Sequence, residues 1–160
     1  MSKIEKIMVC VDLSEYATAA IDYAVEFAGN SNAEILLLNV VHQRDLNAVK
    51  LASAYYPDKL DYDRYVADAK KERYDTIRSL VKERFFDKKS AMTIQVTLGI
   101  PFEAILTVAE AEKVDIIVMG HKGRSNLSLT LFGSNAEKVF RHSQLPVVSV
   151  RNRETLKRNR

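Results

Sequence analysis

The 160-residue sequence is poor in cysteine, proline and glycine and contains no tryptophan. Its single cysteine, Cys10, excludes an internal disulfide and is typical of a reducing compartment, so we expect a cytoplasmic location. No apolar run reaches the roughly 18 residues of a membrane span, and the N-terminus lacks a signal-peptide pattern. Because Cys10 lies in an apolar run, we expect a small buried hydrophobic residue rather than a catalytic thiol.

Neither sign of charge dominates, because 24 Lys and Arg residues face 21 Asp and Glu residues, giving a formal net charge of +3. Much of the excess lies near the C-terminus, so we expect one folded domain over residues 1–151 and a short basic tail over residues 152–160. Such tails are usually solvated, and no DNA-binding motif or stacking aromatic accompanies this one. Nucleic acid and membranes are therefore not expected partners.

Five short runs predict β-strands. Four of them are rich in Val, Ile and Leu throughout, which is typical of strands buried on both faces: residues 7–11, 35–41, 116–119 and 147–150. The fifth run, residues 92–98, alternates apolar and polar residues. This alternation predicts a strand with one poorer face, at the edge of a sheet.

Between these runs the apolar residues recur at helical spacing. The pattern predicts four helices: one carrying a stripe from Ala17 to Ala28 and ending at Gly29, a long one from about Tyr62 to Phe85, one from Pro101 to near Lys113, and one from Ser134 to about His142. Alternating strands and helices predict an α/β fold. We expect a doubly wound, Rossmann-like, five-stranded parallel sheet with helices on both faces.

The segment from His42 to about Asp61 is longer than a usual connection. It contains Pro57, preceded by Tyr55 and Tyr56. Two interpretations stay open: a partly helical flap over the ligand crevice, or a surface excursion without a function. In sheets of this kind the crevice lies at the carboxyl ends of the strands.

The segment that follows the fourth predicted strand has the features of an anion site. It contains three of the five glycines and a serine: Gly120, Gly123, Gly133 and Ser134. Glycine lets backbone N–H groups approach an anion, and a helix N-terminus carries a partial positive charge. Ser134 with Glu137 three residues later is also a capping-box pattern. The alternative is that the glycines only form turns and the serine only caps a helix.

Other candidate residues carry two interpretations or weak signals. Asp12, at the end of the first strand, could contact a ligand or cap the next helix in a capping box with Glu15. His121 and His142 have no partner at metal-binding spacing, so no protein metal site is expected. No Walker-type phosphate loop, Gly-x-Gly-x-x-Gly motif or pair of catalytic carboxylates occurs, and no catalytic residue is predicted.

The spacing Gly, two residues, Gly, nine residues, Gly-Ser resembles the nucleotide-binding signature of the universal stress protein family. The resemblance covers nearly the whole chain, with residues 7–14, 33–40, 114–120 and 136–148 similar to the family's first, second, fourth and closing elements. It implies a five-stranded parallel sheet and a homodimer joined through the last strand, here Pro146 to Arg151. It also implies ATP as the ligand, with Mg²⁺ held mainly by the phosphates.

The resemblance also implies two groups of ligand contacts. Adenine and ribose would lie against Asp12, the backbone of Val40, Met119 and Gly120. The phosphates would be cradled by Gly123, Gly133, Ser134 and Asn135. The sequence departs from the family pattern at two positions: Cys10 stands where ATP-binding members often carry proline, and Asn135 where a small or branched residue is more frequent.

The sequence therefore predicts a homodimeric stress-response or regulatory protein that binds ATP or another adenine nucleotide and is not an enzyme. Two alternatives stay open. One is a slow ATP hydrolase on the same fold. The other is a dimeric interaction module whose glycine segment binds no ligand.

Overall fold

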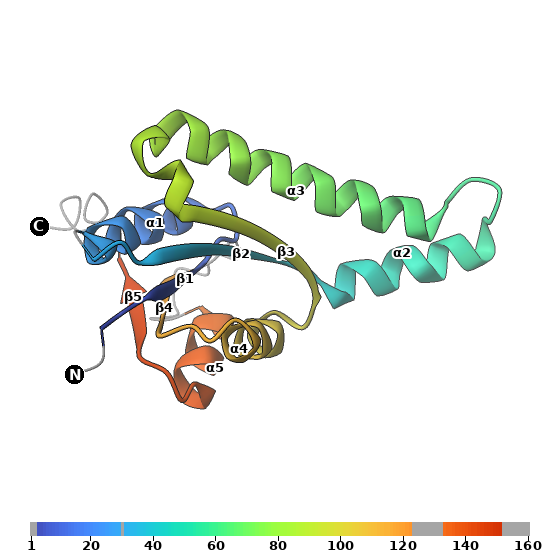
Figure 1. The fold of residues 1–160 in the computed structure, drawn as a ribbon. Helices are drawn as coiled ribbons and strands as arrows, with labels where there is room; N and C mark the ends of the chain where they lie inside the picture. Colours follow the sequence, from blue (N-terminus) through green and yellow to red (C-terminus); the bar gives the residue numbers. More distant parts are fainter. Residues whose placement is uncertain (1–2, 30, 123–132, 152–160) are drawn as a thin grey trace, which may run out of the picture.

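The computed structural model describes residues 3–29, 31–122 and 133–151, and its core is a five-stranded parallel sheet (Figure 1). The strands are β1 (Lys6–Cys10), β2 (Glu34–His42), β3 (Met92–Gly99), β4 (Ile116–Gly120) and β5 (Val147–Val150). Their order across the sheet is β3-β2-β1-β4-β5, and every neighbouring pair is parallel. The predicted doubly wound α/β fold is confirmed.

The helices are α1 (Glu15–Ala28), α2 (Gln43–Tyr55), α3 (Tyr62–Arg84), α4 (Pro101–Ala111) and α5 (Ser134–His142), with a 3₁₀ helix, η1, at Phe86–Ala91. The predicted bounds of α5 are confirmed, as is the start of α4 at Pro101. Helix α4 ends at Ala111, two residues earlier than expected, and Lys113 then adopts a left-handed φ of 52°. Gly29 ends α1 with a φ of 40° and donates its N–H to Val25.

Helices cover both faces of the sheet because neighbouring residues of each strand point to opposite sides. On one face, Ile7 and Val9 pack with the small residues of α1 and with Ile77 and Val81 of α3. On the other face, Met8 packs with residues of α4 and α5. Figure 1 shows α1 and α3 above the sheet and α4 and α5 below it.

Strand β1 lies at the centre of the sheet and marks the point where the chain reverses its direction of winding. It pairs with β2 on one side, Cys10 opposite Leu38, and with β4 on the other, Cys10 opposite Met119. The chain runs from β1 outward to β2 and β3, and then returns past β1 to β4 and β5 at the other side of the sheet. At such a switch point the loops after β1 and β4 separate and leave a crevice at the carboxyl ends of the strands.

The two edges of the sheet are formed by β3 and β5. The prediction of an edge strand at residues 92–98 is therefore confirmed. At the other edge, β5 pairs only with β4 among the described strands. No helix in the described residues is long and apolar enough to span a bilayer.

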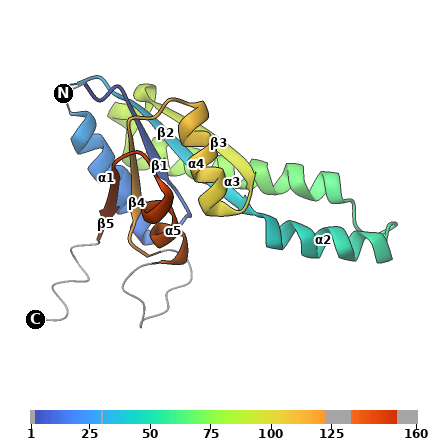
Figure 2. The same ribbon diagram turned by 90° about the horizontal axis from the view of Figure 1, so that it is seen from below.

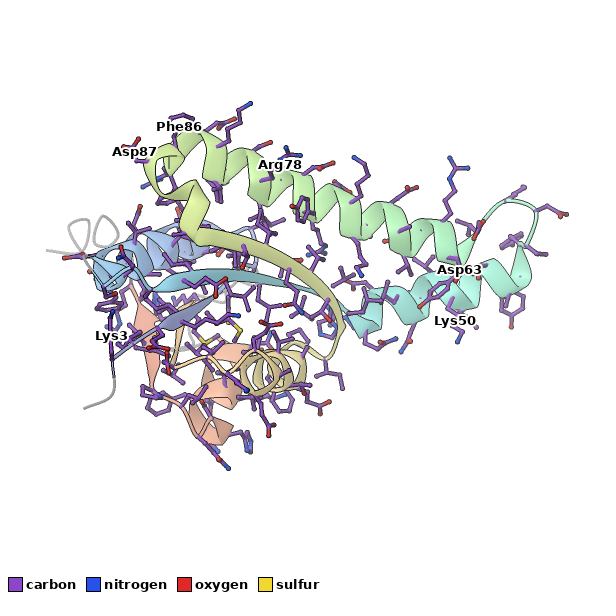
Figure 3. All side chains as sticks on the ribbon, in the orientation of Figure 1. Lys3, Lys50, Asp63, Arg78, Phe86 and Asp87 are labelled. Atoms are coloured by element: carbon purple, nitrogen blue, oxygen red, sulfur yellow. The ribbon has the colours of Figure 1, made fainter. Side chains whose placement is uncertain are left out.

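Helix α2 and the N-terminal half of α3 form a two-helix arm, residues 43–72, that projects beyond the sheet (Figures 1 and 2). In α2 only Leu46 is buried, while Leu51, Tyr55 and Tyr56 are exposed. Figure 3 places Lys50 and Asp63 in this arm, remote from the Arg78 end of α3. The segment after His42 is thus helical, but most of it extends away from the crevice instead of covering it.

Candidate functional site

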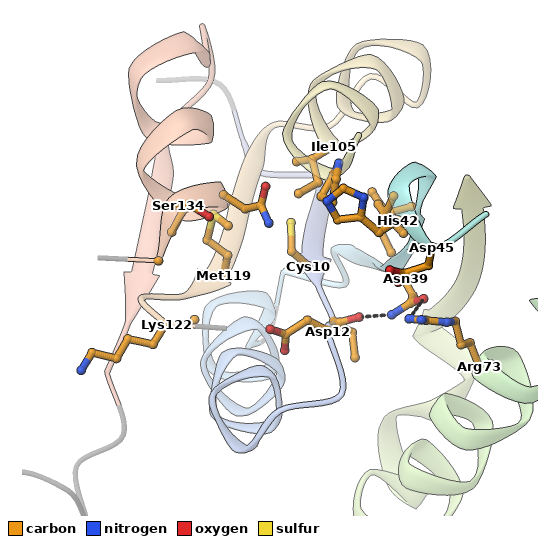
Figure 4. A pocket seen from close by; sticks show the side chains of 18 of the residues that line it. Cys10, Asp12, Asn39, His42, Asp45, Arg73, Ile105, Met119, Lys122 and Ser134 are labelled. Atoms are coloured by element: carbon orange, nitrogen blue, oxygen red, sulfur yellow. Dashed lines mark hydrogen bonds between the residues drawn. The ribbon is translucent and has the colours of Figure 1, made fainter. Parts of the chain in front are cut away.

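A cavity of about 350 Å³ opens at the carboxyl ends of β1, β2 and β4 (Figure 4). It is the crevice expected at the switch point. Seven of the eight residues predicted to hold a nucleotide line it: Asp12, Val40, Met119, Gly120, Gly133, Ser134 and Asn135. The eighth, Gly123, lies outside the described residues.

One end of the cavity is formed by the N-terminus of α5, where Gly133 occupies the N-cap position with extended backbone, φ −66° and ψ 147°. Among the described residues, no side chain makes a capping hydrogen bond to this helix. The predicted capping box is wrong, because Ser134 is the first helical residue and the Glu137 carboxylate pairs with Arg141 at 2.8 Å. The amide groups of the first turn therefore have no side-chain cap, and Lys122 adds a positive charge to the cavity lining.

Gly120 has a packing role in addition to its place in the cavity lining. A Cβ atom built on it would lie 2.6 Å from Cβ of Tyr16, a buried residue of α1. Helix α1 could not approach the end of β4 this closely if residue 120 carried a side chain. The prediction assigned Gly120 only a ligand or turn role, because the contact with α1 joins residues far apart in the sequence.

His121 joins the end of β4 to two neighbouring elements. Its N–H donates to the Val150 carbonyl at 3.0 Å, and its own carbonyl accepts from Gly133 N at 2.7 Å. Its ring packs edge-on against Tyr16, and its Nδ1 is buried without a hydrogen-bond partner in the described residues. Burial lowers the pKa of His121, and the positive charges of Arg151 and Lys122 lower it further. A hydrogen bond to the Val150 backbone acts in the opposite direction and raises this pKa, but does not cancel the effect of burial.

Asp12 stabilises its own turn and does not cap α1. Its Oδ1 accepts hydrogen bonds from Ser14 N at 3.0 Å and from Ser14 Oγ at 2.6 Å. The N-cap of α1 is Ser14, so the suggested capping box of Asp12 and Glu15 is wrong. The chain turns at Leu13, whose φ of 66° is rare for a bulky side chain. Asp12 Oδ2 accepts no hydrogen bond from the described residues and is available to a ligand.

Cys10, predicted to be a small buried residue, lines the cavity and is half-buried. It packs against the apolar cluster shared by α4 and α5. Burial, and next the nearby Asp12 carboxylate, raise the pKa of the Cys10 thiol to about 12. The thiol is therefore protonated near neutral pH and contributes an apolar surface to the cavity.

The opposite end of the cavity contains residues that the sequence analysis did not identify. Asn39 of β2 is 1% exposed; its amide donates to the Val11 carbonyl at 2.6 Å, and its Oδ1 accepts from the Arg73 guanidinium at 3.2 Å. Arg73 of α3 is half-buried and lines the cavity. A polar Asn within the apolar run 35–41 was the one available signal, since Arg73 is one of many charged residues on its helix.

The first turn of α2 completes this end of the cavity with His42, Arg44 and Asp45. His42 caps the helix through Nδ1, which accepts from Arg44 N at 3.0 Å. A neutral His42 therefore carries its proton on Nε2. In the described residues no group of three or more His, Cys, Asp or Glu side chains is arranged to hold a metal ion.

Comparison with known proteins identifies the family. The profile of the universal stress protein family matches residues 3–151. Universal stress protein MJ0577 of Methanocaldococcus jannaschii is 28% identical over 94% of this chain and 97% of its own length, and the MJ0577 structure aligns with a TM-score of 0.78. Universal stress protein YxiE of Bacillus subtilis is 30% identical over 91% of this chain and 98% of its own length. The chain, which has this fold and a cavity at its switch point, belongs to the universal stress protein family.

Proposed function

We propose that this chain is a cytoplasmic, homodimeric regulatory protein that binds an adenine nucleotide, ATP in particular, in the cavity at the switch point. The observation that carries the proposal is the convergence of seven predicted contact residues on one cavity, from the turn after β1, from β2, from β4 and from the start of α5. Proteins of the same fold have been solved with adenine nucleotides: a universal stress protein with cAMP, and one from Archaeoglobus fulgidus with dAMP.

The phosphates are assigned to the α5 end of the cavity. Uncapped amide groups at the start of α5 and the Lys122 ammonium together favour an anion there. Adenine and ribose are assigned to the space beside Asp12, Val40, Met119 and Gly120. Mg²⁺ would arrive with the phosphates and be held mainly by them.

We propose a binding role rather than turnover. The Cys10 thiol is protonated because its pKa is about 12, so it is a poor nucleophile. The Asp12 carboxylate already accepts two hydrogen bonds from Ser14, which hold it in the turn after β1. Bound nucleotide would then act by changing the protein's shape or its choice of partner.

The homodimer is assigned to β5. This strand is at a sheet edge, and its outer side pairs with none of the described strands. Such an edge can pair with the same strand of a second copy across a two-fold axis. Light scattering at micromolar concentration should give the mass of a dimer, and a monomer mass would refute this assignment.

The experiment that tests the ligand begins with freshly purified protein. It is denatured, and the small molecules released are identified by mass spectrometry; the emptied and refolded protein is then titrated with ATP and Mg²⁺. We expect an adenine nucleotide to emerge, or ATP to bind at micromolar strength and raise the melting temperature. If nothing is released and nothing binds, the chain is an interaction module without a ligand.

A further inference from the structure

The cavity has two chemically different ends. Figure 4 shows Ser134 and Lys122 on one side and His42, Asp45 and Arg73 on the other, with Cys10 and Met119 between them. A nucleotide with its phosphates at the start of α5 therefore directs its base toward α2 and α3. We propose that Asp45 and Arg73 are specificity-determining residues that read the edge of this base and select adenine.

Arg73 is positioned to contact a ligand. Asn39, a buried residue, holds the guanidinium by accepting one hydrogen bond at 3.2 Å. Among the described residues no carboxylate lies within 4.0 Å of this guanidinium, so its positive charge has no counterion there. A guanidinium has five N–H donors, so several remain for a group inside the cavity.

Asp45 supplies an acceptor at the same end. It lies in the first turn of α2, and its side chain is 53% exposed. Its one ion-pair partner in the described chain, Arg44, is 3.8 Å away, beyond hydrogen-bond distance. The carboxylate oxygens can therefore accept hydrogen bonds from a ligand without breaking a strong contact.

A donor and an acceptor at the same end of the cavity, here Arg73 and Asp45, can together complement adenine. Adenine presents an acceptor ring nitrogen next to its 6-amino donor, whereas guanine presents the acceptors N7 and O6 side by side. Hypoxanthine, the base of ITP, has a carbonyl in place of the 6-amino group, and this oxygen would face the Asp45 carboxylate. Ile105 and Cys10 provide apolar lining between the polar groups.

This inference rests on the proposed function, and its test is the ratio of ITP to ATP dissociation constants. We expect the unaltered protein to bind ATP about tenfold more tightly than ITP. A difference of this size is typical of one hydrogen bond that the competing ligand cannot make. In Asp45→Asn the amide can donate to the carbonyl of ITP, so the ratio should fall to within about twofold. Asp63→Asn, in the first turn of α3 but in the projecting arm, should keep the tenfold ratio.

Arg73→Gln should weaken ATP about fivefold or more, because a hydrogen bond from a charged donor is lost. Arg78→Gln, on an exposed position of the same helix, should leave affinity unchanged. Urea unfolding of each variant separates a loss of fold from a loss of contact, and Arg73→Lys, which keeps the charge, replaces Arg73→Gln if the latter unfolds.

The outcomes separate the two proposals. If the unaltered protein binds neither ATP nor ITP, the nucleotide function itself fails and the base-reading assignment fails with it. If ATP binds but the ITP to ATP ratio is the same in Asp45→Asn as in Asp63→Asn, the function stands and the assignment of Asp45 is overturned. Unchanged ATP affinity in a folded Arg73 variant overturns the assignment of Arg73.

Discussion

The side-chain amide of Asn39 donates a 2.6 Å hydrogen bond to the backbone carbonyl of Val11. This bond joins the carboxyl end of β2 to the residue that precedes Asp12. The other side of the amide accepts from Arg73, so the one fully buried polar side chain among the described residues connects the turn after β1 to α3. The wall of the cavity at this end therefore depends on the two hydrogen bonds of Asn39.

Replacing Asn39 should destabilise the fold. Asn39→Ala leaves the Val11 carbonyl without its partner in a buried place, which costs about 1–3 kcal/mol of unfolding free energy. Urea denaturation measures the change. Asn47→Ala, at an exposed position of α2, should stay within about 0.5 kcal/mol of the unaltered protein. Equal effects of the two substitutions would contradict a structural role for the Asn39 amide.

Gly120→Ala should destabilise the protein even without any ligand. The added Cβ atom would lie 2.6 Å from Cβ of Tyr16, so α1 must move away from β4. Overpacking of this kind costs about 1–3 kcal/mol. The melting temperature of the nucleotide-free variant measures it, and a value equal to that of the unaltered protein would show that α1 adapts without cost.

Gly133→Val should affect ligand binding more than stability. The backbone at Gly133 has φ −66° and ψ 147°, which a Val residue adopts readily, but Val is a poorer N-cap than Gly, so we expect the unfolding free energy to fall by only about 1 kcal/mol. The branched side chain would crowd the first amide groups of α5. We expect ATP affinity to fall at least about tenfold, which calorimetric titration measures. Retained affinity would place the phosphates elsewhere.

The stability of the fold should decrease as the pH falls below about 6.5, the ordinary pKa of histidine. The pKa of folded His121 is lowered, chiefly by burial, so the unfolded chain binds more protons than the folded one in this range. The contribution of neutral His121 to the free energy of unfolding is therefore fully present above the pKa of this histidine in the unfolded chain. It is lost as the pH falls through the lower pKa of the folded state. Urea midpoints between pH 7.5 and 5 should fall less steeply for His121→Gln than for His142→Gln, whose histidine is exposed. Parallel slopes would contradict this assignment.

The fold was predictable because its signals are local. Short Val, Ile and Leu runs predict buried parallel strands, and Pro101 and Gly29 predict the start of α4 and the end of α1. The capping interactions were less predictable. Glu137 forms an ion pair with Arg141 in its own helix, and Asp12 accepts a hydrogen bond from Ser14. Neither carboxylate therefore makes the contact with a backbone N–H that the predicted capping box requires.

One half of the cavity was predictable and the other was not. The α5 end is predicted by glycines that lie close together in the sequence at a fixed spacing. Arg73 reaches the cavity only because α3 crosses the end of the sheet, and its partner Asn39 is 34 positions away. Nothing in the charge pattern of α3 distinguishes Arg73 from its exposed neighbours. Long-range packing determines which of these cations faces the cavity.

The central position of β1 has a consequence for the order of folding. Strand β1 is synthesised first and pairs with β2 on one side and with β4 on the other. Its partner β4 is distant in the sequence: just before the two strands, the backbone N–H of Glu5 donates to the carboxylate of Asp115, 110 positions later. At about 5–20 residues per second, translation leaves one edge of β1 open for several seconds. During that interval an apolar strand is available for incorrect pairing. A nascent chain of this protein should therefore depend on protection until β4 has been made.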